Sequence, residues 1–583
     1  SIIFHLSYIF STLSKNPRAL FLYISGFSFL VSPLLFTQFL YPNFQSSSLH
    51  FTYLFLYCLI LQLHFLSFFP QNSFMFTNSI SFGGFYMLRN WQSHSDYQKH
   101  LLQRLSVHAQ KERSRLILLD KAISKLYLLN LDNLLPIVKP LYPNSGRPAK
   151  NQQGIIRSLV LMPELHVYSI TNWAKRVQKD DLLFDICGFD SDKAPSVGSY
   201  YDLLWRLWLS SHKKYLGRKR NLRPFIPKPN KRFKPNQKLP NKHTGIVKKL
   251  VDRTVKCKLP DFRPEKILEQ FLARCLVDTS AKMGLLGDIS KLSVAFDGSP
   301  YKSGANHYGV KVCDCRSKGI YNCTCKRRFS DPDATWGWDS YRNQWFYGST
   351  LFTVTASDSP YDLPIYMRIV QANRHDSVTT IFALRDIHSL YHNLNFKYFI
   401  ADGAMDNYPT YYLLKHYHII PFIALDSRTK VKFNYPHPHI LCFDNKGRPI
   451  CPGGIPYQNW GYSKPKGIKY RCWFACHGQK PPQDCMCSDS PYGKVVYIKP
   501  DHDPRMFTPV PRHTKAFNDK FKTRTSVERT HKRLFIDYSI ENARSRSNMM
   551  RFAMATFAAV NIHLDAWVKH TNFSFVDTFI KAA

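Results

Sequence analysis

Residues 291–300 read KLSVAFDGSP, and residues 396–403 read FKYFIADG. In each stretch a short, mostly apolar run ends at an aspartate followed by glycine, which is typical of a buried strand and the turn after it. Asp297 and Asp402 are therefore expected at the carboxyl ends of two strands, Asp297 beside a turn. In open α/β sheets, functional groups gather at this edge. The two stretches predict a sheet that carries two acids at one edge.

The segments around these strands alternate between strand and helix patterns. A helix is expected to open within residues 373–377, where Asp376 or Ser377 is suited to cap it and His375 is interpreted as a structural residue. Strands that alternate with helices indicate an α/β fold. Further strands are expected at residues 347–356, 364–370 and 419–425, and helices at residues 373–391 and 407–416.

A third acid follows much later in the chain. Arg524, Glu528 and Lys532 are spaced i, i+4 and i+8, so they share one helix face. On an exposed helix this is an ordinary salt-bridged stripe. Beside two strand-end carboxylates, Glu528 becomes a third metal ligand, flanked by cations that can hold phosphates.

With these residues in view, the sequence resembles the DDE transposases of bacterial insertion sequences over most of residues 110–565. No single mark is decisive, but their order along the chain is typical of the family. The marks are FDGS at 296–299, DPDA at 331–334 with Trp336, Tyr347-Gly348, NRHDS at 373–377, IADG at 400–403, IIPFI at 419–423 and the Arg524/Glu528 helix.

The resemblance implies an α/β catalytic core with an RNase H-like fold, preceded by an all-α domain that helps to bind the element's ends. We expect the core at residues 263–575, as a mixed sheet flanked by helices. A β-rich insertion that contains cysteines is expected at about residues 426–515, before the last catalytic helix.

The resemblance also implies cleavage of DNA at the element's ends and strand transfer into target DNA. In-line attack on a phosphodiester needs a deprotonated nucleophile and a stabilised leaving oxygen, and two divalent ions supply both. Mg²⁺, or Mn²⁺ in its place, prefers oxygen ligands. We expect Asp297 to bridge two ions, Asp402 to hold one of them and Glu528 to hold the other.

Two positions depart from the family pattern. One large branch carries a tyrosine three residues before the arginine and a lysine seven residues after the glutamate, where this chain has Phe521 and Phe535. Arg524 is expected to orient the DNA backbone, with Lys532 or Arg533 in place of the missing lysine.

The charge of the chain predicts a polyanionic partner. Its 583 residues hold 80 Lys and Arg against 40 Asp and Glu, which favours nucleic acid first and an anionic membrane surface second. Residues 212–262 are the most basic stretch and are rich in proline, so we expect an extended linker that contacts DNA phosphates. Its candidate contacts are Lys213, Lys214, Arg218, Lys219 and Arg220.

The remaining N-terminal residues divide into two parts. Residues 87–211 show helical periodicity and are expected to form a DNA-binding domain, although most small helical domains share this pattern. Residues 1–86 are almost uncharged, with apolar runs at 21–40 and 51–69. Two interpretations stay open for this segment: upstream sequence that is not translated, and a membrane-like hydrophobic leader.

Eight of the 14 cysteines form two groups. Four thiolates can close a tetrahedral zinc site, although C-x-C is less regular than the usual spacing, and free thiols in loops are the alternative. The groups are Cys313, Cys315, Cys323 and Cys325, and Cys472, Cys476, Cys485 and Cys487.

Two functions from different classes remain at this stage. The first is an active Mg²⁺-dependent transposase, working as a homo-oligomer on inverted repeats and target DNA. The second is an inactive or repurposed DNA-binding protein on the same scaffold. In either case we expect a cytoplasmic, nucleoid-associated protein without a membrane partner.

Overall fold

The computed structural model describes residues 86–88, 91–149, 151–189, 194–209, 222–223, 245–261, 263–426, 435–482, 488 and 490–580. The apolar runs at 21–40 and 51–69 and the basic residues 213–220 lie outside this part of the chain. Among the described residues, no helix combines the length and the apolar character that a bilayer crossing requires.

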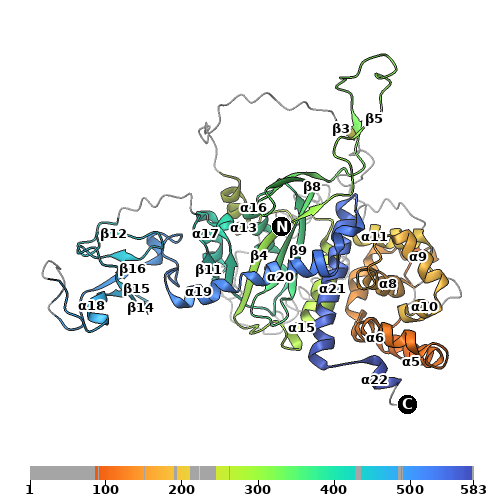
Figure 1. The fold of residues 1–583 in the computed structure, drawn as a ribbon, viewed down its shortest axis with the longest axis horizontal. Coiled ribbons are helices and arrows are strands. Elements are labelled where there is room, and N and C mark those ends of the chain that lie inside the picture. Colours follow the sequence, from red (N-terminus) through yellow and green to blue (C-terminus); the bar gives the residue numbers. More distant parts are fainter. Residues whose placement is uncertain are drawn as a thin grey trace, which may run out of the picture. The chain divides into compact units, whose positions relative to one another are not determined.

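A six-stranded mixed sheet lies at the centre (Figure 1). Strand β10 runs parallel to both β4 and β11, whereas β8 runs antiparallel to β4, β7 and β9. The order is β11-β10-β4-β8-β7, with β9 also on β8. The bounds are β4 Leu292–Lys302, β7 Thr335–Asp339, β8 Gln344–Ala356, β9 Pro364–Gln371, β10 Phe396–Ala401 and β11 Ile420–Ile423.

Strand β4 is longer than the sequence suggested. We expected it to end at Phe296, with Asp297 beside a turn, and this prediction was wrong because β4 continues to Lys302. The long antiparallel partner β8 pairs with β4 through Asp297 and on to Lys302. Asp297 therefore lies within a strand, while β10 ends at Ala401, directly before Asp402.

Helices cover both faces of this sheet. Ala295 and Ile400 form an apolar cluster with Phe517 and Val527, which places α19 and α20 on their face. Helix α16 packs against β4 and β8 from the other face of the sheet. The bounds are α16 Asp376–Leu390, α17 Tyr408–His416, α19 Lys515–Lys522 and α20 Thr525–Lys532.

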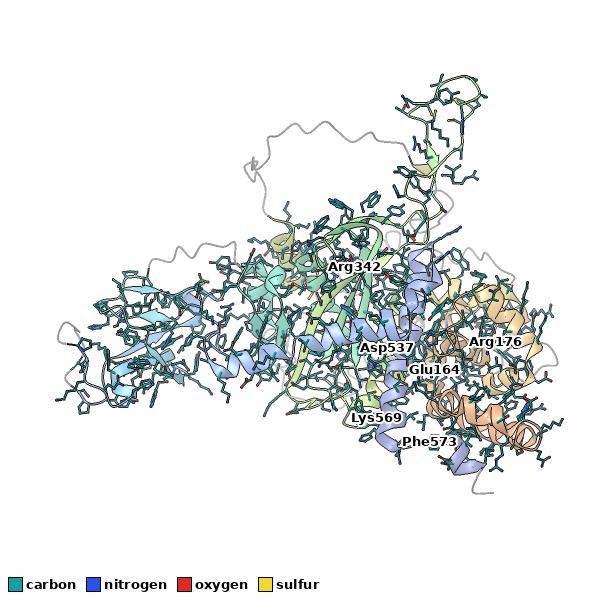
Figure 2. All side chains as sticks on the ribbon, in the orientation of Figure 1. Glu164, Arg176, Arg342, Asp537, Lys569 and Phe573 are labelled. Atoms are coloured by element: carbon teal, nitrogen blue, oxygen red, sulfur yellow. The ribbon has the colours of Figure 1, made fainter. Side chains whose placement is uncertain are left out.

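Helix α21 (Asn548–Thr571) joins the sheet to the N-terminal helices. It packs against β9 and against α6 and α8 (Figure 1). At this contact Lys125 lies 2.5 Å from Glu164, which Figure 2 labels, and 2.7 Å from Asp565. The N-terminal helices are α5 His94–Lys111, α6 Arg113–Leu128, α7 Leu135–Val138, α8 Gln152–Glu164, α9 Ile170–Lys179, α10 Asp181–Cys187 and α11 Val197–Leu207.

Part of the expected linker is a helix instead. Residues Ile246–Val255 form α13, which packs against α16 and α17. Leu250 and Val251 are buried there, and the last proline of the basic stretch before this helix is Pro240. The prediction of an extended linker over 212–262 is therefore wrong for these ten residues, because their apolar side chains share one helix face.

The expected β-rich insertion is present between β11 and α19. Its strands surround a small core of its own that includes Ile468, Tyr470 and Val496. The elements are β12 Cys442–Phe443, β13 Pro449–Ile450, β14 Gln458–Ser463, β15 Gly467–Arg471, α18 Trp473–Cys476 and β16 Val495–Ile498.

The remaining elements are short. Residues Lys266–Lys282 form one helical run that includes a wider π-type turn. Strand β3 (Leu222–Arg223) pairs with β6 (Arg327–Arg328), which also pairs with β5 (Val310–Lys311). Two-residue strands β1 (Tyr86–Met87) and β2 (Arg147–Pro148) pair with each other, and α22 (Phe575–Phe579) follows α21. The structure thus confirms a mixed α/β sheet flanked by helices and preceded by a helical region.

Candidate active site

Asp297 lies on β4, and Asp402 directly follows β10, the parallel neighbour of β4. Ala295 of β4 pairs with Ile400 of β10, and each acid lies two residues farther along the chain. Because side chains alternate across a strand, the register directs both acids to the face that carries Ala295 and Ile400. The sheet therefore brings the two predicted acids together.

Backbone N–H groups hold both carboxylates. Asp297 Oδ1 accepts a hydrogen bond from Gly298 N at 2.9 Å. Asp402 Oδ1 accepts one from Ala404 N, also at 2.9 Å, and so caps the short turn Gly403–Met405 (η5). Both acids are half-buried. Each is thus anchored by its own turn or strand and keeps a side open to a ligand.

A third carboxylate, Asp376, lies at the same place and was missed by the sequence analysis. It is the first residue of α16, and its Oδ1 would lie only 2.5 Å from a Cβ atom placed on Gly298. The glycine after Asp297 therefore gives Asp376 room to approach the strand. Its position within the NRHDS mark was the available signal, but we interpreted that mark as a helix cap.

The helix cap is a different residue from the two expected. His375 caps α16, because its Nδ1 accepts a hydrogen bond from Ser377 N at 3.2 Å. The structural role expected for His375 is thereby supported, whereas the capping role expected for Asp376 or Ser377 is wrong. Asp376 is left with its carboxyl group directed at Gly298.

The electrostatics of these acids follow from burial and mutual repulsion. Burial, together with the nearby charges of Asp376 and Asp402, raises the pKa of Asp297 to about 7, although the Gly298 N–H and Arg524 act in the opposite direction. Burial and Asp402 likewise raise the pKa of Asp376 to about 7. Carboxyl groups that repel one another in a poorly solvated place favour a bound proton or a cation. We call Asp297, Asp376 and Asp402 the acidic cluster.

Glu528 lies on the helix that covers this face of the sheet. Val527, one residue earlier, packs against Ala295 and Ile400, which precede the two acids on their strands. Arg524 Nη2 donates to Glu528 Oε1 at 2.5 Å. Because Arg524 also acts on the pKa of Asp297, its charge reaches the acidic cluster. The packing of α20 therefore brings Arg524 and Glu528 to the side of the sheet where Asp297 and Asp402 point.

The two other expected DNA contacts, Lys532 and Arg533, differ in their surroundings. Lys532 is exposed at the end of α20. Arg533 is engaged elsewhere: it donates to the Tyr361 carbonyl at 2.9 Å and to Asp565 at 3.2 Å. Of the two substitutes considered from the sequence, Lys532 is therefore the one that is available to a ligand.

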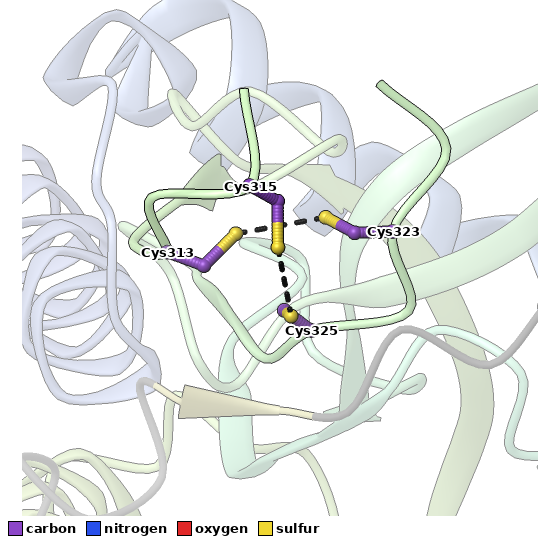
Figure 3. Close-up of side chains that lie close together, drawn as sticks. All are labelled: Cys313, Cys315, Cys323 and Cys325. Atoms are coloured by element: carbon purple, nitrogen blue, oxygen red, sulfur yellow. Dashed lines mark hydrogen bonds between the residues drawn. The ribbon is translucent and has the colours of Figure 1, made fainter. Parts of the chain in front are cut away.

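The first cysteine group comes together in space. The sulfurs of Cys313, Cys315, Cys323 and Cys325 all lie within 4.8 Å of one another (Figure 3). In the second group, Cys485 and Cys487 fall outside the described residues, so that zinc prediction stays a prediction. Cys472 of that group is buried.

A mixed sheet of this strand order, with helices on both faces, one acid on β4 and another directly after the adjacent β10, defines an RNase H-like domain. Residues 296–562 match the family model described as the transposase DDE domain. The chain carries a transposase DDE domain over this span, and such a domain implies DNA cleavage and strand transfer. No curated protein matches the chain.

Proposed function

We propose that this protein is a DNA transposase of an insertion sequence, which cleaves DNA at the ends of its own element and joins the ends to target DNA. One observation carries the proposal. Asp297 on β4 and Asp402 directly after β10 each lie two residues beyond the paired residues Ala295 and Ile400, and α20, which bears Glu528, packs on the face of those two residues. This packing supports a site built from three carboxylates.

The donor set fits divalent cations such as Mg²⁺ or Mn²⁺. Clustered carboxyl groups whose pKa values are raised by burial and repulsion are the groups that a hard cation stabilises most. Asp297, Asp402 and Glu528 would hold the ions. When bound, two such ions activate the attacking hydroxyl and stabilise the leaving oxygen of a phosphodiester.

The chain's own residues orient these groups and the DNA. The backbone N–H groups of Gly298 and Ala404 fix the carboxylates of Asp297 and Asp402. Arg524 holds Glu528 in an ion pair, and its guanidinium is suited to grip a DNA phosphate near the acids. Asp376 adds a fourth negative group that increases the attraction of the site for cations.

The test compares the full chain with Glu528→Gln on supercoiled DNA that carries the element's own flanks. In Mg²⁺ we expect nicking or end cleavage by the full chain and at least a 10³-fold slower reaction with Glu528→Gln, since one metal ligand is lost. Gel-shift binding of the ends should be retained. Asp501→Asn is the matched control, because Asp501 is an exposed acid paired with Lys415 on the surface.

The outcomes separate the two candidate functions. Cleavage that depends on both Mg²⁺ and Glu528 supports the transposase. If the full chain and Glu528→Gln both bind the ends and neither cuts them, the catalytic proposal fails. A DNA-binding protein that keeps the scaffold without the reaction then takes its place.

A further inference from the structure

A hairpin of the catalytic domain carries four cysteines that the proposed reaction does not use. It leaves the sheet after β4, pairs β5 with β6 antiparallel, and returns to β7. Two cysteines follow β5 and two precede β6. We call residues 302–328 the cysteine arm, and Figure 1 shows its strand β5 at a distance from the central sheet.

The sulfur positions fit one tetrahedral metal ion. Cys313 Sγ lies 3.5 Å from Cys323 Sγ, and Cys315 Sγ lies 3.5 Å from Cys325 Sγ (Figure 3). A Zn–S bond of about 2.3 Å places the sulfurs of a tetrahedron about 3.8 Å apart. The observed separations are far too long for disulfide bonds of about 2.05 Å. An iron–sulfur cluster with several irons would hold the four thiolates farther apart.

Little else in the described structure holds the tip of the arm. Between residues 312 and 326, Cys323 is the one buried side chain, and Ile320 and Tyr321 are 52% and 65% exposed. A loop without an apolar core needs another source of order, and in small protein modules a structural metal supplies it. All four cysteines face one another at the place where such an ion would lie.

The surface of the arm is strongly basic and partly aromatic. Residues 302–328 contain seven Lys or Arg and a single acid, Asp314. A zinc ion with four thiolates has a net charge of about −2, so the arm stays positive with the metal bound. The exposed members of this set are Arg316, Lys318, Lys326 and Arg328, together with the aromatic residues Tyr308 and Tyr321.

The base of the arm is tied to the catalytic domain. Ser303 Oγ donates to Asp331 Oδ2 at 2.6 Å, and Asp331 forms a fully buried ion pair with Arg551 of α21 at 2.5 Å. The arm also continues directly from β4, the strand that carries Asp297. A rigid, positive arm attached to this strand is well placed to contact DNA that reaches the acids.

We propose that Cys313, Cys315, Cys323 and Cys325 bind one structural Zn²⁺ and that the zinc-bound arm contacts the DNA backbone. The DNA half of this proposal rests on the proposed function. The cations supply sequence-independent attraction to phosphates, and the exposed tyrosines supply surfaces on which bases stack.

The metal is tested on the full chain by elemental analysis. The double variant Cys313→Ser/Cys323→Ser should lose one equivalent of zinc per chain, whereas Cys257→Ser/Cys442→Ser, at two exposed cysteines outside the arm, should lose none. Equal zinc content in all three proteins overturns the proposal. If the first variant does not fold, Cys325→His in the Co²⁺-substituted protein replaces it. The thiolate-to-cobalt absorption should shift in that variant, and an unchanged spectrum overturns the zinc assignment.

The DNA contact is tested with Lys326→Gln/Arg328→Gln, and the control is Lys291→Gln/Lys569→Gln. The control lysines are exposed, at the opposite end of β4 and near the end of α21. We expect the arm variant to bind DNA about tenfold more weakly and the slope of log K against log salt to fall by about 2, because two phosphate contacts are lost. The control should lose less on both measures, and equal losses overturn the DNA contact.

The two proposals fail in different ways. If the full chain cleaves DNA and the arm variant binds as the full chain does, the transposase stands and the arm contact falls. If the salt slope changes in the arm variant but no protein cleaves DNA, the arm contact stands and the transposase falls.

Discussion

Two groups of acids in the same domain differ in whether cationic side chains form ion pairs with them. Asp386 of α16 is fully buried and is surrounded by arginines: Arg368 at 2.8 Å, Arg263 at 3.4 Å, and Arg385. The hydroxyl of Tyr366 also donates to it at 2.7 Å. In the acidic cluster, by contrast, no lysine or arginine of the described residues forms an ion pair with Asp297, Asp376 or Asp402.

This difference separates a structural charge from a functional one. The Asp386 network neutralises its charge within the protein and links α16 to β9 and to the segment before the helical run Lys266–Lys282. The acidic cluster has no ion pair of this kind, although the charge of Arg524 acts on Asp297, so its acids repel one another until a proton or a cation binds. A buried acid with three arginines is already neutralised and needs no ligand. Three acids without an ion-pair partner are stabilised when a cation binds.

The largest effect on stability is expected at Asp386. Asp386→Asn should lower the free energy of unfolding by about 3–5 kcal/mol, because removing one partner leaves buried arginines uncompensated. The measurement is the shift of the urea midpoint at pH 7. Asp376→Asn, the same change in the acidic cluster, is the matched comparison and should not destabilise the protein. Equal destabilisation by both variants would contradict the distinction between the clusters.

A smaller effect on the free energy of unfolding, of opposite sign to that at Asp386, is expected at Asp376. Its folded pKa, raised to about 7, lies above the value near 4 of an unfolded aspartate. Between about pH 4 and 7 the folded state therefore binds more protons than the unfolded state, so stability without metal falls as the pH rises through this window. Below pH 4 both states are protonated and the effect vanishes.

Asp376→Asn should remove this loss. In EDTA at pH 8 we expect the variant to be more stable than the unmodified chain by roughly 1–3 kcal/mol, and at pH 4 the two should agree. Melting temperatures across the pH range provide the measurement. Added Mg²⁺ should stabilise the unmodified chain more than the variant, because the cation relieves the same repulsion. A gain that is independent of pH would show that Asp376 acts through packing instead.

The sequence predicted those parts of the site that depend on local patterns. The strand Phe396–Ala401 and the acid after it were predicted correctly, because an apolar run and a glycine turn mark both ends. The prediction ended the strand of Asp297 too early, because Gly298-Ser299-Pro300 is typical of a turn. Its continuation depends on pairing with β8, more than 40 residues away.

Contacts between distant segments could not be predicted from a single sequence. Asp376 reaches the site because Gly298, far earlier in the chain, leaves space for it, and no local pattern carries that information. The arginines around Asp386 come from residues 263 to 385 and meet only in the folded protein. The cysteine arm is an intermediate case. The spacing of its four cysteines indicated metal ligands, but only the fold shows that all four sulfurs come together.

The smallest effect is expected at an ion pair as short as those of the Asp386 network. Lys415 Nζ lies 2.6 Å from Asp501 Oδ1, but the two side chains are 62% and 72% exposed. Water screens exposed charges and already solvates both groups, so Asp501→Asn should change the free energy of unfolding by less than about 1 kcal/mol. The same urea titration measures it, with and without 1 M NaCl. If Asp501→Asn destabilised the protein as much as Asp386→Asn, the separation between charges would govern stability, and burial could not explain why one group of acids is structural and the other is prepared for a ligand.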